Sequence, residues 1–185
     1  QDGISRTVDL YYRTDKPYED QGGNYELVTT GASMRFGIPF SETDTVFFGG
    51  GFEQTQIKAG TNIPATYLAY ANTYGATSNS IPLTVGWSRD DRDSALAPNS
   101  GRYQRLNSEW SVAGDARYVR GNYQYQQYIP LNKRFTVAFN GELGYGKGLN
   151  GRPFPVFKNF YSGGLGSVRG FDQGTLGPRD VTGAS

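Results

Sequence analysis

The chain has 185 residues, with 18 basic and 17 acidic side chains, and it contains no cysteine and no histidine. The net charge of +1 gives no electrostatic reason to expect nucleic acid as a partner, so we expect no nucleic-acid binding. The lack of cysteine excludes disulfides and thiolate metal sites, and the lack of histidine removes the commonest general base.

The mean hydropathy is −0.58, and no apolar run approaches the ~20 residues that a membrane helix needs. The chain nevertheless has 26 glycines, and aromatic residues make up 15% of it. This composition is typical of a membrane β-barrel, in which only alternate residues face lipid. The first residues, Gln1 to Gly3, are not a signal peptide. We therefore expect an interior part of a longer protein.

Apolar and polar residues alternate in about seven segments between roughly residues 5 and 150. This period of two predicts an all-β antiparallel meander of long strands, and we find no helix-period segment of useful length. Several segments reach the ~9–11 residues that cross a bilayer. The apolar sides are, in chain order, Val8, Leu10 and Tyr12; Val28, Ala32, Met34, Phe36 and Ile38; Val46, Phe48 and Phe52; Ile81, Leu83, Val85 and Trp87; Leu106, Trp110 and Val112; Val119, Tyr123, Tyr125 and Ile129; and Phe135, Val137, Phe139, Leu143 and Tyr145.

The opposite sides carry Arg, Glu, Asn, Gln and Gly. Alternation alone does not distinguish a soluble sandwich, whose polar face meets bulk water, from a barrel whose polar face lines a wet lumen. Aromatic residues near strand ends favour the barrel, because outer-membrane barrels carry aromatic girdles at both interfaces, although Tyr and Trp are also common in any strand. The girdle residues would be Tyr11, Tyr12, Phe40, Trp87, Tyr103, Tyr128, Phe135 and Tyr145.

Successive antiparallel strands alternate in direction, so every second connection lies on the same side of the sheet. If the last connection is extracellular, then the first, third and fifth connections are extracellular too. We therefore expect residues 59–79, which are rich in Thr, Asn, Ala and Tyr, to form an exposed outer loop.

No segment carries the residues of an active site, since serine has no histidine or cysteine with which to form a triad. The stretch from Arg89 to Asp93 lacks the spacing and the distal glutamate of a calcium loop. We interpret it as a solvated turn with local ion pairs and expect no metal site. The glycine-rich stretches 144–148 and 163–167 do not match a phosphate-binding signature.

The stretch from Phe154 to Pro178 reads FPVFKNFYSGGLGSVRGFDQGTLGP. Its glycines, together with Pro153 and Pro155, make a poor strand and a worse helix. We predict a long loop over residues 151–180 that carries Arg169 on a glycine-hinged tip. The string resembles the VRGF loop of the BamA family of outer-membrane β-barrel assembly proteins. The matching positions are Phe160, Gly163, Gly164, Ser167, Val168, Arg169, Gly170, Phe171, Gly177 and Pro178.

The resemblance extends upstream to Gly86-Trp87, to the segment from Asn99 to Arg102, to the turn from Tyr128 to Leu131, and to Gly144-Tyr145-Gly146. It implies that residues 1–185 are part of a 16-stranded transmembrane barrel, of which about seven strands and a lumen-directed loop are present. The POTRA domains and the other strands of such a protein would be absent from this chain.

The resemblance also implies a function: folding and inserting β-barrel proteins into the outer membrane of a Gram-negative bacterium, without a cofactor and without catalysis. The implied partners are outer-membrane lipid, unfolded β-barrel substrates and accessory assembly lipoproteins. The arginine that matches Arg169 pairs with acidic residues inside the lumen, and a confined guanidinium does need carboxylate partners. Within this chain, the candidates on polar strand faces are Glu53, Glu109 and Glu142.

Three alternatives stay open at this point. A two-partner secretion transporter of the same superfamily also carries an Arg-Gly-aromatic loop. A passive porin or adhesin-like barrel and a soluble β-sandwich binding module both fit the strand pattern. An open seven-stranded sheet also has two unpaired edges, so we expect the isolated chain to self-associate through them.

Overall fold

The computed structural model describes residues 3–16, 25–58, 60, 63, 65–132 and 134–159. The predicted loop motif from Gly163 to Pro178, with Arg169, lies outside the described residues. Seven long strands fall within the predicted segments, which confirms the expected strand content. The elements are β1 (Ser5–Asp15), β2 (Glu26–Pro39), β3 (Asp44–Lys58), α1 (Ala65–Tyr74), β4 (Thr77–Asp90), β5 (Gly101–Gly114), β6 (Tyr118–Asn132), β7 (Phe135–Gly148) and the 3-10 helix η2 (Val156–Lys158).

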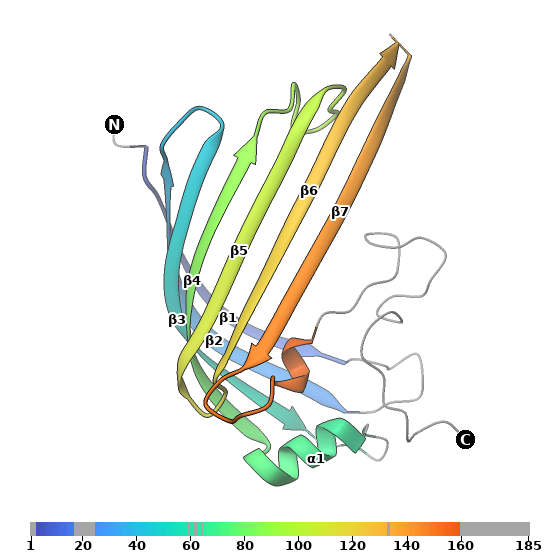
Figure 1. Cartoon of the computed structure of the whole chain (residues 1–185). Helices are drawn as coiled ribbons and strands as arrows, with labels where there is room; N and C mark the ends of the chain where they lie inside the picture. Colours follow the sequence, from blue (N-terminus) through green and yellow to red (C-terminus); the bar gives the residue numbers. More distant parts are fainter. Residues whose placement is uncertain are drawn as a thin grey trace, which may run out of the picture.

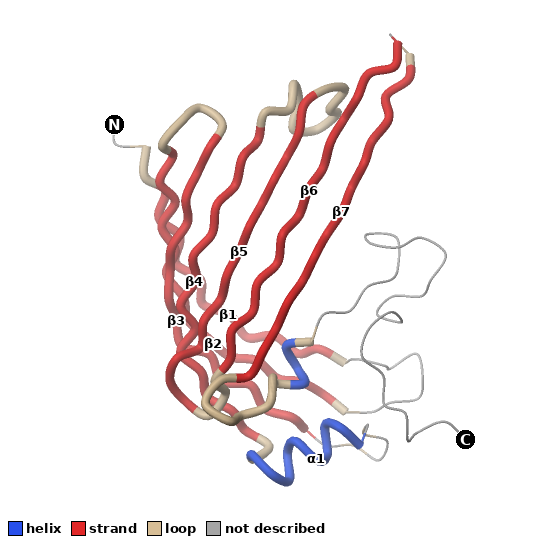
Figure 2. The backbone as a smooth tube through the Cα atoms, viewed as in Figure 1, coloured by secondary structure: helices blue, strands red, loops and turns tan. Residues whose placement is uncertain are grey.

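The strands form one sheet in the order β1 to β7, and every neighbouring pair is antiparallel. The predicted antiparallel meander is therefore confirmed. Figure 1 shows that the sheet curves into an open trough, and the backbone tube in Figure 2 shows the same curvature without the ribbon. None of the described helices is long and apolar enough to cross a membrane.

The apolar side chains predicted to share a face alternate as expected, and most of them are exposed or half-exposed, whereas Val28 is buried. Cross-strand pairing places Val8 opposite Met34 and Phe36 opposite Phe48, whose rings stack with centroids 5.3 Å apart. Leu10 keeps 81% of its surface exposed. A continuous exposed apolar face over seven strands is unfavourable in water, and it fits contact with lipid. We call this face the outer face and the opposite, polar one the inner face.

A helix forms where the sequence predicted only an exposed loop, so that part of the prediction is wrong. Tyr67, Tyr70, Ala71 and Tyr74 recur at helical spacing and turn one side of α1 toward the sheet. They pack with the cluster of Tyr25, Leu27, Ile57, Val156 and Phe157 at the end of the trough. A ten-residue helix is marginal alone in water, so this packing, rather than local propensity, stabilises α1.

Gly31 in β2 leaves room for a side chain to cross the inner face. A Cβ atom at Gly31 would lie 2.6 Å from the ring and hydroxyl of Tyr11 and 2.8 Å from the Phe52 carbonyl oxygen. Gly31 pairs with Tyr11 on one side and with Glu53 on the other. Tyr11 therefore reaches from β1 across β2 toward β3 only because position 31 has no side chain.

We expect Gly31→Ala to destabilise the folded protein by ~1–3 kcal/mol, because the methyl group overpacks against Tyr11 and the backbone of β3. The measurement is the midpoint temperature at which the folded protein loses its fast migration on a semi-native gel. Gly121→Ala is the matched control, since a Cβ atom there approaches nothing closer than 3.5 Å. Equal midpoints for the two variants would contradict the expectation.

Candidate functional site

The inner face lines a cavity of about 510 Å³ with both signs of charge. Glu53 and Glu109 contribute carboxylates, Arg35 and Arg120 contribute guanidinium groups, and Lys158 enters from η2. These residues come from five elements, so the curvature of the sheet gathers them. The predicted polar face is thus a charged concave wall.

Lys158 binds two carboxylates on different strands. Its ammonium nitrogen Nζ lies 2.6 Å from Oε1 of Glu53 on β3 and 3.7 Å from Oε1 of Glu109 on β5. The side chains of Lys158 and Glu53 are only 13% and 11% exposed. Because partial burial reduces solvent screening, the Coulombic attraction in these contacts is larger than in an ion pair on an open surface.

Two tyrosines complete this cluster by donating hydrogen bonds to the same carboxylates. The Tyr11 hydroxyl donates to Oε2 of Glu53 at 3.0 Å, and the Tyr118 hydroxyl donates to Oε1 of Glu109 at 2.6 Å. Tyr118 is fully buried. We call Tyr11, Glu53, Glu109, Tyr118 and Lys158 the Lys158 cluster; it joins β1, β3, β5, β6 and η2.

The segment that carries Lys158 is held by aromatic contacts. Phe154 packs edge-on against Tyr118, with ring centroids 5.8 Å apart, and covers Gly146, where a Cβ atom would lie 2.6 Å from its ring. The Phe157 ring meets Tyr70 of α1 edge-on at 5.8 Å. The Tyr67 hydroxyl of α1 donates to the Val156 carbonyl oxygen at 3.3 Å. Residues 154–158 are therefore fixed between α1 and the inner wall.

The structure brings together two of the three predicted acidic residues. Glu53 and Glu109 meet at Lys158, whereas Glu142 lies on β7, is exposed, and has no ion-pair partner among the described residues. Sequence reasoning missed Lys158, Tyr11 and Tyr118. The one available signal was that two carboxylates on predicted inner faces require a cation; no sequence spacing could show that Lys158 supplies it.

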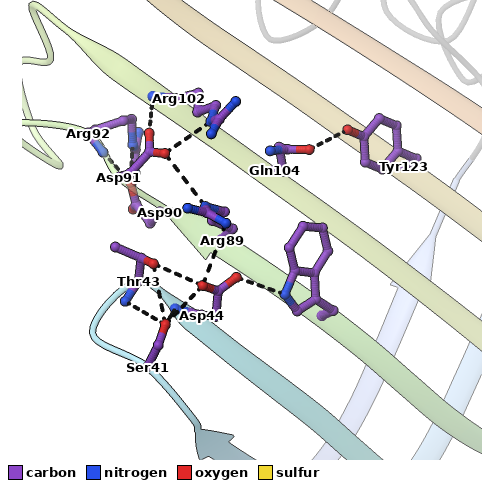
Figure 3. A network of polar contacts seen from close by, with 11 residues as sticks. Ser41, Thr43, Asp44, Arg89, Asp90, Asp91, Arg92, Arg102, Gln104 and Tyr123 are labelled. Carbon is purple, nitrogen blue, oxygen red and sulfur yellow. Dashed lines mark hydrogen bonds and ion pairs between the residues drawn. The ribbon is translucent and has the colours of Figure 1, made fainter.

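A second polar network lies at the opposite ends of β3, β4 and β5 (Figure 3). The Asp44 carboxylate accepts hydrogen bonds from Ser41, Thr43 and the Trp87 indole, and it lies 3.9 Å from Arg89. Near it, Arg92 pairs with Asp90 at 2.7 Å and Arg102 pairs with Asp91 at 3.0 Å. These contacts confirm local ion pairs in the stretch from Arg89 to Asp93. The girdle prediction is wrong for Tyr11, which lies on the inner face and donates to Glu53, whereas for the other residues, including Trp87, it stays a prediction.

Within the described ranges, no group of three His, Cys, Asp or Glu side chains is arranged to hold a metal ion. The Arg89–Asp93 stretch instead closes the β4–β5 connection. The Asp93 carboxylate accepts hydrogen bonds from the backbone amides of Asn99 at 2.9 Å and Ser100 at 3.1 Å. The arrangement is that of a structural turn.

Comparison with known proteins places the whole chain in one family. Residues 1–185 match the model of the Omp85 superfamily domain. Outer membrane protein assembly factor BamA of Neisseria meningitidis serogroup B is 34% identical over 96% of this chain, which spans 24% of that relative. The human sorting and assembly machinery component 50 homolog is 29% identical over 49% of this chain and 20% of its own length.

A solved structure agrees with the fold. The crystal structure of BamA from Haemophilus ducreyi lacking POTRA domains 1–3 superposes with a TM-score of 0.86 and 24% sequence identity. The match covers 96% of this chain and 36% of that one. The seven-stranded sheet is therefore folded like part of the BamA barrel.

The turn at Asp93 gives a pH-dependent expectation. Hydrogen bonds from the Ser100 and Asn99 amides lower the pKa of the Asp93 carboxyl below its usual value. A lowered pKa in the folded state means that the contribution of Asp93 is present above the unfolded pKa of ~3.9 and is lost as the pH falls through the folded pKa. We expect the Asn99 and Ser100 amides to lose protection from hydrogen exchange, relative to neighbouring strand amides, in that acidic range.

The control is Asp93→Asn, which cannot titrate. In this variant, the protection of the Asn99 and Ser100 amides from hydrogen exchange should not fall in the acidic range, after correction for the pH dependence of intrinsic exchange rates. An unchanged step in that variant would assign the titration to another group.

Proposed function

Because the chain belongs to the Omp85 superfamily, we propose that it is a wall segment of an outer-membrane barrel that folds and inserts other β-barrel proteins. The observation that carries this proposal is a lipid-compatible outer face combined with a charged inner wall that holds the base of the predicted loop through Lys158. The names of the bacterial and human relatives favour assembly over two-partner secretion or a passive pore.

We further propose that residues 1–185 are one partial barrel domain, with strands over roughly 5–150 and the loop over 151–180. The chain spans about a quarter of the Neisseria relative, so the remaining strands and the POTRA domains would belong to other parts of a longer protein. The role is structural and chaperone-like, without catalysis, and its place is the outer membrane of a Gram-negative bacterium. Its partners are outer-membrane lipid, unfolded β-barrel substrates and accessory assembly lipoproteins.

The loop motif enters this proposal through Arg169. We propose that Arg169 pairs with a carboxylate in the lumen. Of the three acidic residues considered, Glu53 and Glu109 already contact Lys158, whereas Glu142 lies on the inner side of β7 and has no described ion-pair partner. Glu142 is therefore the partner in this chain that fits best.

A chimera tests the proposed function. We expect that this chain, replacing the matching segment of the Neisseria relative, supports growth of cells depleted of that relative, because the two are 34% identical over 96% of the chain. The measurement is growth together with the amount of folded porin in the outer membrane. A chimera that reaches the membrane folded but assembles no porin would contradict the proposal.

The open edges give a second test. β1 and β7 each have a neighbour on only one side of the described sheet, and lipid does not tolerate an open edge. We propose that the isolated chain pairs edge to edge with a second copy. Light scattering should show a dimer in detergent, and a monomer, either in detergent or without it, would count against edge pairing.

A further inference from the structure

We infer that Lys158 is a positioning residue: by bridging Glu53 and Glu109, its ammonium group fixes the position of residues 154–158 on the inner wall. One consequence of the inference, that the position of this segment matters to barrel assembly, rests on the proposed function. Its structural part concerns η2 and the wall alone.

The charges explain why Lys158 stays on the wall. Glu53 and Glu109 carry like charges, yet both contact the same ammonium nitrogen, at 2.6 and 3.7 Å. The Glu53 side chain is 11% exposed and the Glu109 side chain 27%. Two carboxylates brought this close in a poorly solvated place need a cation between them, and removing the cation leaves the charges uncompensated.

The ring of Tyr118 reinforces the position of the ammonium group. Nζ of Lys158 lies 5.7 Å from the centroid of the Tyr118 ring, within the range of a cation–π contact. The same ring is covered by Phe154, and its hydroxyl is committed to Glu109. Lys158 therefore meets an aromatic face and two carboxylates whose orientations are set by other contacts.

The segment from Phe154 to Lys158 is held by aromatic packing and by charged contacts, which join it to different elements. Phe157 and Val156 join it to α1 through ring packing and one hydrogen bond at 3.3 Å. Phe154 adds ring packing against Tyr118 of β6, and the short charge-assisted contact of Lys158 is the attachment to the carboxylates of β3 and β5. Lys158 is thus the residue that registers the segment against β3 and β5, one residue before the end of the described chain at Asn159.

The experiment measures that position directly. The chain contains no cysteine, so spin labels on Gln56→Cys, on the exposed outer side of β3, and on Asn159→Cys report one distance within it. The measurement uses the full-length chimera, with any cysteine of the Neisseria segments replaced. We expect one narrow distance distribution with Lys158 and with the conservative variant Lys158→Arg. We expect Lys158→Met to lose the narrow peak.

Lys147→Met is the matched control. It makes the same substitution on β7, where Lys147 is exposed and has no ion-pair partner among the described residues, and it should keep the narrow peak. A narrow peak in Lys158→Met would overturn the inference. Equal loss of the peak in Lys147→Met would also overturn it, because the effect would then be general destabilisation.

The carboxylates provide an independent arm if Lys158→Met fails to fold. The double variant Glu53→Gln with Glu109→Gln keeps side-chain size and removes both charges, so it should lose the narrow peak while Lys158 is present. Adding Lys158→Met to that double variant should change little more, since residues that act as a unit are not additive. A peak that survives in the double variant would overturn the inference.

Growth separates this inference from the proposed function. In the chimera, Lys158→Met should lower the amount of assembled porin, and Lys147→Met should not. A chimera that shows the narrow peak but assembles nothing would overturn the proposed function and leave the positioning role of Lys158 supported. A lost peak with unchanged assembly would overturn the link between the position and assembly.

Discussion

A poorly solvated charge on the inner face of this sheet needs a partner from another strand or from η2. The Lys158 cluster meets this requirement with one ammonium group, two carboxylates and two tyrosine hydroxyls. The outer face has no such demand, because most of its side chains are apolar and its charged ones, such as Lys147, are exposed. Side chains alternate between the two faces, so most of the charged side chains collect on the inner face, where the poorly solvated ones must find oppositely charged partners. The Lys158 cluster connects the strands to η2, and η2 in turn packs against helix α1.

The end of the trough that carries α1 combines two types of packing. Tyr67 and Tyr70 bury one side of the helix against Tyr25 and the strand ends, and the rings of Tyr70 and Phe157 meet edge-on. The charged contacts of Lys158 involve Glu53 and Glu109, which lie five residues before the ends of β3 and β5 at Lys58 and Gly114. Because both attach to residues 154–158, a disturbance of the helix would be transmitted to the cluster through η2. The other end of the sheet is organised differently, with ion pairs between neighbouring turns, as around Asp44 (Figure 3).

The comparisons give this arrangement its context. The chain belongs to the Omp85 superfamily, and its open seven-stranded sheet is folded like part of the BamA structure from Haemophilus ducreyi. A sheet with two free edges is stable in lipid only when further strands or another copy cover those edges. The pairing of Lys158 with Glu53 and Glu109 comes from the geometry of this chain.

The sequence by itself determined the number of strands, their approximate ends and the side chains on each face, because a period of two is a local property of the chain. It also predicted Glu53, Glu109 and Glu142 as inner-face carboxylates, and the family loop motif around Arg169 stays a prediction. Only the tertiary structure decided that Glu53 and Glu109 share Lys158, whereas Glu142 lies apart. It also decided that residues 65–74 form a helix. Both outcomes depend on contacts between residues far apart in the chain, which the curvature of the sheet brings together and which no local pattern encodes.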